Sequence, residues 1–503
     1  MHFLQLPECL EGVFKHLDNK SLYQCLFVNR FWSQNVVPFF WFNPFLNYSH
    51  FTEASYIDII ETYISCLPKK TRGQLFVNLE PVVLTTPSFN YPSYLRHLEF
   101  TIIYKLIMRW TTRRFKFNNK TNYDLENQIF REIWNMLLSS CPSFKSLVLI
   151  SLDYGGFNEI LHDPHVLFTS TNCTRGLFEK LDLFHSYCMP SEIINCFAQI
   201  STQTTKMRIT NSDMNPGMDA LIRSQKNLKT VALINCSNLS KVLQILHENH
   251  SSNLIELTIK EKEFDPTWNE VGPVISLENL QILTLNSSAI VFSKQVLEKF
   301  LFTTYKNLTV LDVEIHSPHI SQLVTLLQNT NNKLVYLRLL WYYHKDPENI
   351  MLLTKTVIQC CINLTLLTFK LSKETIHLLP TILGSLILLT EASFYNASSD
   401  ASHIYNLEEL LPECGKVLHW PLKYLGLLLP WTITAEALEI FFKNAEANMI
   451  KEFYLYTDSL DSGNVSKEHQ DILDMYASKG VGAYIAARAN VKPENEHAYD
   501  IKM

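Results

Sequence analysis

Glycine is scarce in this sequence. It supplies 13 of 503 residues, where ordinary usage would give about 35. Folds that place glycine in phosphate-binding loops and tight hairpins are therefore disfavoured. The sequence also has no G-x-x-x-x-G-K-[ST], G-x-G-x-x-G, G-x-S-x-G or H-E-x-x-H motif, and these motifs are common marks of nucleotide-binding proteins, hydrolases and zinc proteases. We therefore expect a chain that is not an enzyme and that uses no cofactor.

An excess of one charge and paired cysteines are also lacking. The 43 basic and 49 acidic residues leave a net charge of -6, which does not favour binding to nucleic acid or to an anionic membrane. The 11 cysteines include no C-x-x-C pair, so we expect reduced, mostly buried thiols and no metal site.

Long apolar runs are absent as well. The most apolar window, residues 376–389, contains Pro380 and is shorter than the roughly 20 residues of a membrane helix. The first residues have no basic region followed by an apolar one, which argues against a secretion signal. We expect an intracellular protein, cytoplasmic or nuclear, that contacts neither nucleic acid nor membrane.

Leucine, in contrast, is abundant, at about 14% of the chain, well above its ordinary share. From about residue 140 to 456 a pattern recurs: apolar, two variable, apolar, one variable, apolar. Its copies start about 24 to 30 residues apart, a spacing typical of leucine-rich repeats. The clearest copies are Leu228/Val231/Leu233, Leu254/Leu257/Ile259, Leu280/Leu283/Leu285, Leu308/Leu311/Val313, Leu334/Leu337/Leu339 and Leu364/Leu367/Phe369. Weaker copies are Phe178/Leu181/Leu183, Leu422/Leu425/Leu427 and Ile450/Phe453/Leu455, with an isolated earlier one over residues 94–100.

The pattern predicts one strand and one helix in each unit. Each copy alternates at its end, as a short strand with one buried face does. Between copies the spacing becomes helical, as in Leu239/Val242/Leu243/Leu246, Val296/Leu297/Phe300/Leu301 and Ile320/Leu323/Val324/Leu327. Such units cannot bury their apolar faces alone and must stack, which makes an α/β solenoid. The alternative, an ordinary α/β domain, would not produce so many near-equal spacings.

The first forty residues have a different pattern. A helical apolar stripe is formed by Leu10, Val13, Phe14 and Leu17. Pro7 suits the first turn of that helix. A second short helix begins near Leu22, and a third is expected over residues 29–37, ending before Pro38. Three helices with this much apolar surface cannot complete a core alone, so they need a partner.

Two stretches resemble known families. The repeats resemble leucine-rich repeats, whose longer form adds Asn or Cys and a further leucine, as in Leu228, Val231, Leu233, Cys236 and Leu239. The first forty residues resemble the F-box motif through Leu6-Pro7-Glu8, Val13-Phe14, Leu17-Asp18, Leu22, Val28-Asn29-Arg30-Phe31-Trp32 and Trp41. Together they imply a leucine-rich-repeat horseshoe with an N-terminal all-α F-box three-helix module.

The resemblance implies the substrate-recognition subunit of an SCF-type ubiquitin ligase, which is a receptor and not a catalyst. The F-box would dock on a Skp-type adaptor, and through it on a cullin scaffold, while the repeats would bind a target protein. The residues implied for adaptor binding are Leu6, Pro7, Val13, Leu17, Leu22, Val28, Arg30 and Trp32. An alternative stays open, a non-catalytic leucine-rich-repeat scaffold with no ubiquitin connection, whose first 45 residues only cap the solenoid.

The target would bind along the strands. In leucine-rich repeats the variable residues between the leucines face the concave side, and large aromatics beside Arg and Asp tend to dominate protein interfaces. The candidates are Asp312, Glu314, Arg338, Trp341, Tyr342, Tyr343, Tyr395, Trp431, Tyr454 and Tyr456. The same reasoning places Asp182, Phe184 and Arg208 on this face.

Four parts are expected along the chain. They are the F-box over residues 1–45, a connecting segment with degenerate early repeats over 46–140, leucine-rich repeats over 141–457, and a C-terminal cap and tail over 458–503. In the last part, Ser466 is expected to be the N-cap of a helix.

Overall fold

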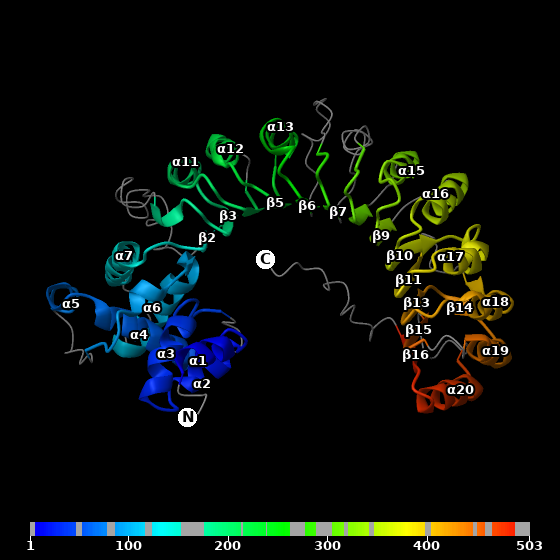
Figure 1. Ribbon diagram of the computed structural model, residues 1–503, viewed down its shortest axis with the longest axis horizontal. Coiled ribbons are helices and arrows are strands. Elements are labelled where there is room, and N and C mark those ends of the chain that lie inside the picture. The colour runs from blue at the N-terminus through cyan, green and yellow to red at the C-terminus, as the bar shows by residue number, and fades with distance from the viewer. Residues whose placement is uncertain are drawn as a thin grey trace. The chain divides into compact units, whose positions relative to one another are not determined.

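The computed structural model describes residues 6–46, 53–77, 86–115, 123–151, 176–212, 215–237, 239–261, 277–287, 304–315, 320–341, 347–397, 404–445, 450–457 and 465–487. The chain forms two compact units, Met1–Leu228 and Lys229–Met503. Within each unit parallel strands alternate with helices, and strands that are neighbours in the main sheet follow one another in the sequence (Figure 1). This confirms the predicted α/β class.

Unit 1 begins with three short helices, α1 (Pro7–Phe14), α2 (Asn19–Cys25) and α3 (Arg30–Phe40). Asp18 caps α2 by accepting the backbone N–H of Ser21 at 2.8 Å, and Asn29 caps α3 by accepting that of Trp32 at 2.9 Å. Such side-chain caps stabilise a helix by about 1 kcal/mol. The Trp32 ring packs edge-on against the buried Phe14, with 5.7 Å between ring centroids. We call α1 to α3 the three-helix module.

Helix α3 does not end before Pro38 as predicted, because it continues to Phe40. An interior proline costs a helix about 3 kcal/mol. The last turn, however, places Phe39 against Phe14 and Phe40 against Tyr23, each with 5.7 Å between ring centroids. Burying an aromatic ring contributes about 1.5–3 kcal/mol, so tertiary packing offsets the cost of the proline.

The rest of unit 1 contains α4 (Glu53–Cys66), α5 (Lys69–Leu75), the 3-10 turn η3 (Tyr91–Tyr94), β1 (His97–Glu99), α6 (Phe100–Phe115), α7 (Tyr123–Ser140), β2 (Ser146–Ile150), β3 (Leu183–Tyr187), α11 (Ser191–Ile200), β4 (Lys206–Thr210) and α12 (Pro216–Ser224). The described part of segment 46–140, where we expected irregular connection, is therefore mostly helical. Two of its prolines lie at the starts of helical segments, since Pro68 directly precedes α5 and Pro92 lies in the first turn of η3. Neither interrupts a helix.

Aromatic contacts join the three-helix module to the rest of unit 1. The ring of Trp41 lies 4.5 Å from that of Tyr91 and 5.1 Å from that of Tyr63, and Trp41 is buried. The carbonyl of Phe42 accepts the N–H of Arg96, just before β1, at 3.0 Å. The predicted border after residue 45 is thus crossed by contacts, as is the border after residue 140, where β1 pairs with β2.

The register of β1 to β4 corrects one repeat. Leu98, Leu147, Phe184 and Met207 lie opposite one another on successive strands and are all buried. The buried row around β3 is therefore Leu181, Phe184 and Ser186. Of the predicted Phe178, Leu181 and Leu183, the first two are buried, whereas Leu183 is only half-buried. Phe184, which we expected on the open face, stacks on Phe197 in the core at 4.5 Å. The pattern misled because Leu183 is apolar, whereas the buried Ser186 is polar.

Unit 2 contains β5 (Thr230–Ile234), α13 (Leu239–His250), β6 (Glu256–Glu261), β7 (Ile282–Ser287), β8 (Val310–Ile315), α15 (Ile320–Gln328), β9 (Tyr336–Trp341), α16 (Pro347–Cys360), β10 (Leu366–Leu371), η5 (Ile376–Leu378), α17 (Leu379–Ser385), β11 (Glu391–Asn396), β12 (Tyr405–Asn406), α18 (Leu410–Val417), β13 (Tyr424–Leu428), β14 (Trp431–Thr432), α19 (Ala435–Ala445), β15 (Glu452–Thr457), α20 (Lys467–Ser478) and β16 (Gly482–Ala487). The helices of this unit lie on one side of its main sheet (Figure 1).

The leucine pattern predicted most of this unit. Its six clear copies and the weaker copies at Leu422 and Ile450 coincide with strands, and their apolar residues are buried. The helical sets at Leu239 and Ile320 coincide with α13 and α15. The set at residues 296–301 lies outside the described residues. Strand β11, which the pattern missed, buries a small alanine, Ala392, where most other copies have leucine.

The sheet of unit 2 continues past the predicted end of the repeats at residue 457. Strand β16 pairs in parallel with β15, with Phe453 opposite Ala483. Between them, Ser466 is the N-cap of α20, as predicted, and forms a reciprocal capping box with His469. The C-terminal part thus contributes one more strand and helix to the array.

Turns after the strands use residues other than glycine. Cys188, Asn211 and Asn235 directly follow β3, β4 and β5 and have φ angles of 50°, 47° and 51°. This left-handed conformation usually favours glycine, although asparagine also tolerates it. The scarcity of glycine is therefore met at equivalent positions of successive repeats by asparagine and, once, by cysteine.

Two expectations from composition can be compared with the described residues. None of the described helices is long and apolar enough to cross a membrane. The described cysteines are free thiols, and the buried ones are Cys25, Cys141, Cys236, Cys361 and Cys414.

Candidate protein-binding surfaces

The three-helix module exposes several of the residues predicted to bind an adaptor. Leu6, Val13 and Val28 are 41%, 41% and 56% exposed, and the smaller or charged Pro7 and Arg30 are exposed too. Exposed large apolar side chains on a small helical module are typical of a binding surface. We call Leu6, Val13 and Val28, together with Phe27, the exposed apolar set.

Three of the predicted adaptor residues have an internal role. Leu22 is buried in the module, at 5% exposure, and Leu17 and Trp32 are half-buried. Trp32 packs against Phe14 as described above. These side chains hold the helices together and so position the exposed ones.

Sequence reasoning missed Phe27. It is 71% exposed, more than any other large apolar residue of the module, and its ring lies 5.2 Å from that of Tyr23. Its position directly before Val28, a predicted adaptor-binding residue, could have indicated that Phe27 is exposed as well. A phenylalanine in the turn between two helices has no core position to fill.

The second candidate surface is the side of the unit 2 sheet that faces away from its buried leucines. Its middle row passes along neighbouring strands through Thr258, Thr284, Asp312, Arg338, Thr368 and Ser393, which lie opposite one another in that order. We call this side the outward face. The register confirms that Asp312, Glu314 and Arg338 share it, as predicted.

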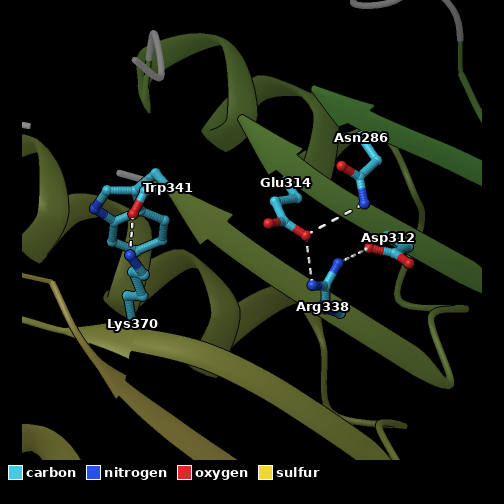
Figure 2. A network of polar contacts seen from close by, with 6 residues as sticks. All are labelled: Asn286, Asp312, Glu314, Arg338, Trp341 and Lys370. Carbon is cyan, nitrogen blue, oxygen red and sulfur yellow. Dashed lines mark hydrogen bonds and ion pairs between the residues drawn. The ribbon is translucent and has the colours of Figure 1, made fainter. Parts of the chain in front are cut away.

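These charged residues form one network on β7, β8 and β9 (Figure 2). The guanidinium of Arg338 donates through Nη1 to Oδ1 of Asp312 at 2.9 Å and through Nη2 to Oε2 of Glu314 at 2.5 Å. The amide of Asn286 donates to the same Glu314 oxygen at 3.2 Å. On the next strand the ammonium of Lys370 donates to the backbone carbonyl of Trp341. Partial burial makes these pairs stronger than exposed ones.

Burial and neighbouring charges shift the pKa values of this network. Burial raises the pKa of Asp312, against the opposing effect of the Arg338 charge. Burial works against the charge of Arg338 as well, but Asp312 and Glu314 outweigh it and hold the pKa of Arg338 above its ordinary value. One guanidinium is thus shared by two carboxylates. Burial also lowers the pKa of Lys370 to about 8, although the charge of Glu314 favours the ammonium.

The prediction that two tryptophans contact the target is wrong. Trp341 and Trp431 are 0% and 2% exposed, so neither can contact a partner directly. Trp341 ends β9 and packs edge-on against Phe369 at 5.5 Å, and its indole Nε1 has no hydrogen-bond partner among the described residues. Trp431 pairs with Tyr405 in a small second sheet of β12 and β14. Both were expected just past a strand, but each lies within one, and Trp341 shares the buried face of Leu337 and Leu339.

Only some of the tyrosines predicted to bind the target lie among the residues that the structure describes. Tyr395 and Tyr454 are half-buried on the outward face. Tyr456 belongs to β15, two residues further along the strand, and nothing more is described of its side chain. Tyr342 and Tyr343 lie outside the described residues.

Tyr424 joins this group and was missed by sequence reasoning. It begins β13, and its ring centroid lies 5.3 Å from that of Tyr454 on β15. Burial raises the pKa of Tyr424, so its phenol is neutral. The sequence could have indicated this. The residue between Leu425 and Leu427 was predicted to lie on the outward face, and Tyr424, two residues earlier on the same strand, shares that face.

The chemistry of both surfaces suits binding. Among the described residues no group of three or more His, Cys, Asp or Glu side chains is placed to hold a metal ion. The charged side chains of the network are turned toward one another and stabilise neighbouring strands. A scan against protein-family models and a search of curated proteins give no match to this chain.

Proposed function

We propose that this chain is the substrate receptor of an SCF-type ubiquitin ligase, with an F-box in its first 45 residues and leucine-rich repeats stacked as a horseshoe. The observation that carries the proposal is the exposed apolar set, because Leu6, Val13 and Val28 occupy positions of the F-box-like motif and Phe27 directly precedes Val28. In the described part of unit 1, Leu6, Val13, Phe27 and Val28 are four of the large apolar residues left exposed, and all fall within one short stretch. An adaptor that covered them would remove apolar surface from water.

A purely capping role accounts for less of the structure. The residues directly after α3 already connect the module to the rest of unit 1: the Trp41 ring packs on Tyr63 and Tyr91, and the Phe42 carbonyl accepts the Arg96 N–H. Capping uses those residues and gives no reason for Val28 and Phe27 to be exposed. A second surface, available to a second partner, therefore supports the receptor proposal over the scaffold alternative.

The proposed mechanism is proximity. The three-helix module would bind a Skp-type adaptor and through it a cullin scaffold, while the outward face holds a target protein. A separately recruited conjugating enzyme would supply the ubiquitin thioester, and the receptor would raise the effective concentration of the target lysine beside it. No side chain of this chain would take part in bond making, and the complex would work in the cytoplasm or the nucleus.

Binding to a purified Skp-type adaptor tests the proposal. Val28→Glu places a charge on the exposed apolar set, and we expect it to weaken adaptor binding about tenfold or more, since burying an apolar side chain is worth about 1.5–3 kcal/mol. Val77→Glu is the matched control, because Val77 is 73% exposed in the same unit but outside the module. The proposal is overturned if the unaltered chain does not bind the adaptor, or if both variants bind it equally well.

A further inference from the structure

Strands β11, β13 and β15 carry two tyrosines and two glutamates in adjacent positions of the outward face. Tyr424 lies directly opposite Glu391 on one neighbouring strand and opposite Glu452 on the other. Its ring is inclined at 34° to that of Tyr454, with 5.3 Å between centroids. Both glutamates are exposed and both tyrosines are half-buried. We call these four side chains the tyrosine-glutamate site.

Gly426 gives the Tyr424 ring its place. A Cβ atom at Gly426 would lie 2.9 Å from the Tyr424 hydroxyl and 3.2 Å from its Cε1 atom. The ring therefore leans forward along its own strand, above the position of Gly426, which has no side chain. Because Gly426 is also opposite Tyr454, the two rings approach each other there, beside the row that contains Glu391 and Glu452.

The tyrosine-glutamate site has carboxylates but no cation of its own. Among the described residues neither Glu391 nor Glu452 takes part in an ion pair. Lys423 and Lys451 directly precede β13 and β15 and are exposed, yet they pair with neither glutamate. The Tyr454 hydroxyl reaches Glu452 only at 3.5 Å, a long contact that leaves the carboxylate able to accept a stronger donor.

The same face shows what such a pair of carboxylates binds. On β8, Asp312 and Glu314 hold the guanidinium of Arg338 between them at 2.9 and 2.5 Å. At the tyrosine-glutamate site, strands about 4.8 Å apart place Glu391 and Glu452 on the two strands that flank Tyr424. A cation there would gain both carboxylates and a ring face within about 6 Å.

We propose that the tyrosine-glutamate site binds an arginine or lysine side chain of a protein partner, so that the outward face recognises a basic segment. Two exposed carboxylates repel phosphate and acidic side chains, which disfavours an acidic or phosphorylated segment. Tyrosine rings also supply large contact area at low entropic cost. The inference names the target class of the receptor proposed above and rests on that proposal for its biological role.

Fluorescence anisotropy with full-length protein and a labelled peptide of arginine, glycine and serine tests this inference. Glu391→Gln with Glu452→Gln should weaken binding about five- to tenfold, since exposed charge pairs contribute up to about 1 kcal/mol each, and should reduce its salt dependence. Tyr424→Leu, which keeps both charges, should weaken it severalfold through loss of the ring face. Glu436→Gln is the matched control, because Glu436 is an exposed glutamate on α19, and it should leave binding unchanged.

The inference is overturned if the double variant and Glu436→Gln bind the basic peptide equally, or if an aspartate, glycine and serine peptide binds better. Adaptor binding, measured on the same preparations, separates it from the receptor proposal. Loss of peptide binding with adaptor binding intact overturns this inference alone. Peptide binding that follows the expected order without any adaptor binding supports the inference and overturns the receptor role.

Discussion

Replacing Arg338 with methionine would leave Asp312 and Glu314 on the outward face with no positive partner of comparable geometry. Methionine keeps much of the side-chain length and apolar stem, so the change tests charge more than packing. In the unaltered chain the side chains of Arg338, Asp312 and Glu314 are 13%, 22% and 12% exposed. The network thus lies between a surface pair and a buried one.

The expected loss is about 2–3 kcal/mol at neutral pH. Removing one partner of a fully buried pair costs about 3–5 kcal/mol, and an exposed pair contributes about 0–1 kcal/mol. The repulsion that Arg338 now screens gives a similar figure. Alternate residues of a strand lie about 7 Å apart, and two unit charges at that distance repel by about 2 kcal/mol at an effective dielectric constant of 20.

The pH dependence identifies the cause. Without Arg338, the folded-state pKa values of Asp312 and Glu314 would lie above their unfolded values of about 3.9 and 4.3. The folded variant then holds protons that the unfolded chain releases, so its stability is greatest below those values and falls as pH rises. The deficit relative to the unaltered chain should therefore be large at pH 7 and small near pH 4.

Native-state hydrogen exchange over β8 and β9 measures this local stability without requiring that the whole chain unfold in one step. The matched control is Glu314→Gln added to Arg338→Met, which removes the repulsion and should recover about half or more of the loss. A deficit that is equal at pH 4 and pH 7, or no recovery in the double variant, would refute the electrostatic account.

Three further substitutions concern unit 1. Burial raises the pKa of Glu99 to about 7, so ionised Glu99 lowers the free energy of unfolding as pH rises through 7. Burial lowers the pKa of His185 to about 4, so His185 lowers the free energy of unfolding as pH falls below about 6.5. Glu99→Gln should raise the free energy of unfolding by up to about 3 kcal/mol at pH 8 and change it little at pH 4, as thermal unfolding at both pH values would show; an equal gain at both would contradict the ionisation argument. Gly12→Ala meets no atom within 4 Å in α1, whereas a Cβ at Gly217 would lie 2.3 Å from the carbonyl oxygen of Ser191. We expect Gly12→Ala to raise the melting temperature, because it adds about 0.5–1 kcal/mol of helix propensity. Gly217→Ala should lower the melting temperature, because it overpacks α11 against α12 at a cost of about 1–3 kcal/mol. Shifts of the same sign would contradict this contrast.

The repeats were predictable because their signal is local. A strand with one buried face needs alternating apolar side chains, and Leu257 with Ile259 or Leu337 with Leu339 satisfies this without reference to distant residues. The helix at Leu239 follows from the same kind of periodicity. The charged pair Asp312 and Arg338 could also be assigned to one face, because both occupy the variable position between two apolar residues.

Other features depend on neighbours that are remote in the sequence. The buried row at β3 is set by pairing with β4, which places Phe184 beside Met207 and inside the core. Helix α3 continues beyond Pro38 because the ring of Phe40 packs against that of Tyr23. Trp341 lies on the buried face with Leu337 and Leu339 because β9 continues to residue 341, and it packs there against Phe369 of the next strand.

The sequence by itself determined that strands and helices would alternate, roughly where each strand lies, and that glycine would not build the turns, because backbone conformation and one-sided burial follow local patterns. The tertiary structure alone decided which side chains reach the outward face. It placed Tyr424 opposite Glu391 and Glu452 on the two neighbouring strands, and it buried Trp431. Parallel pairing brings residues about one repeat apart in the chain to within a strand spacing, and no local pattern contains that distance.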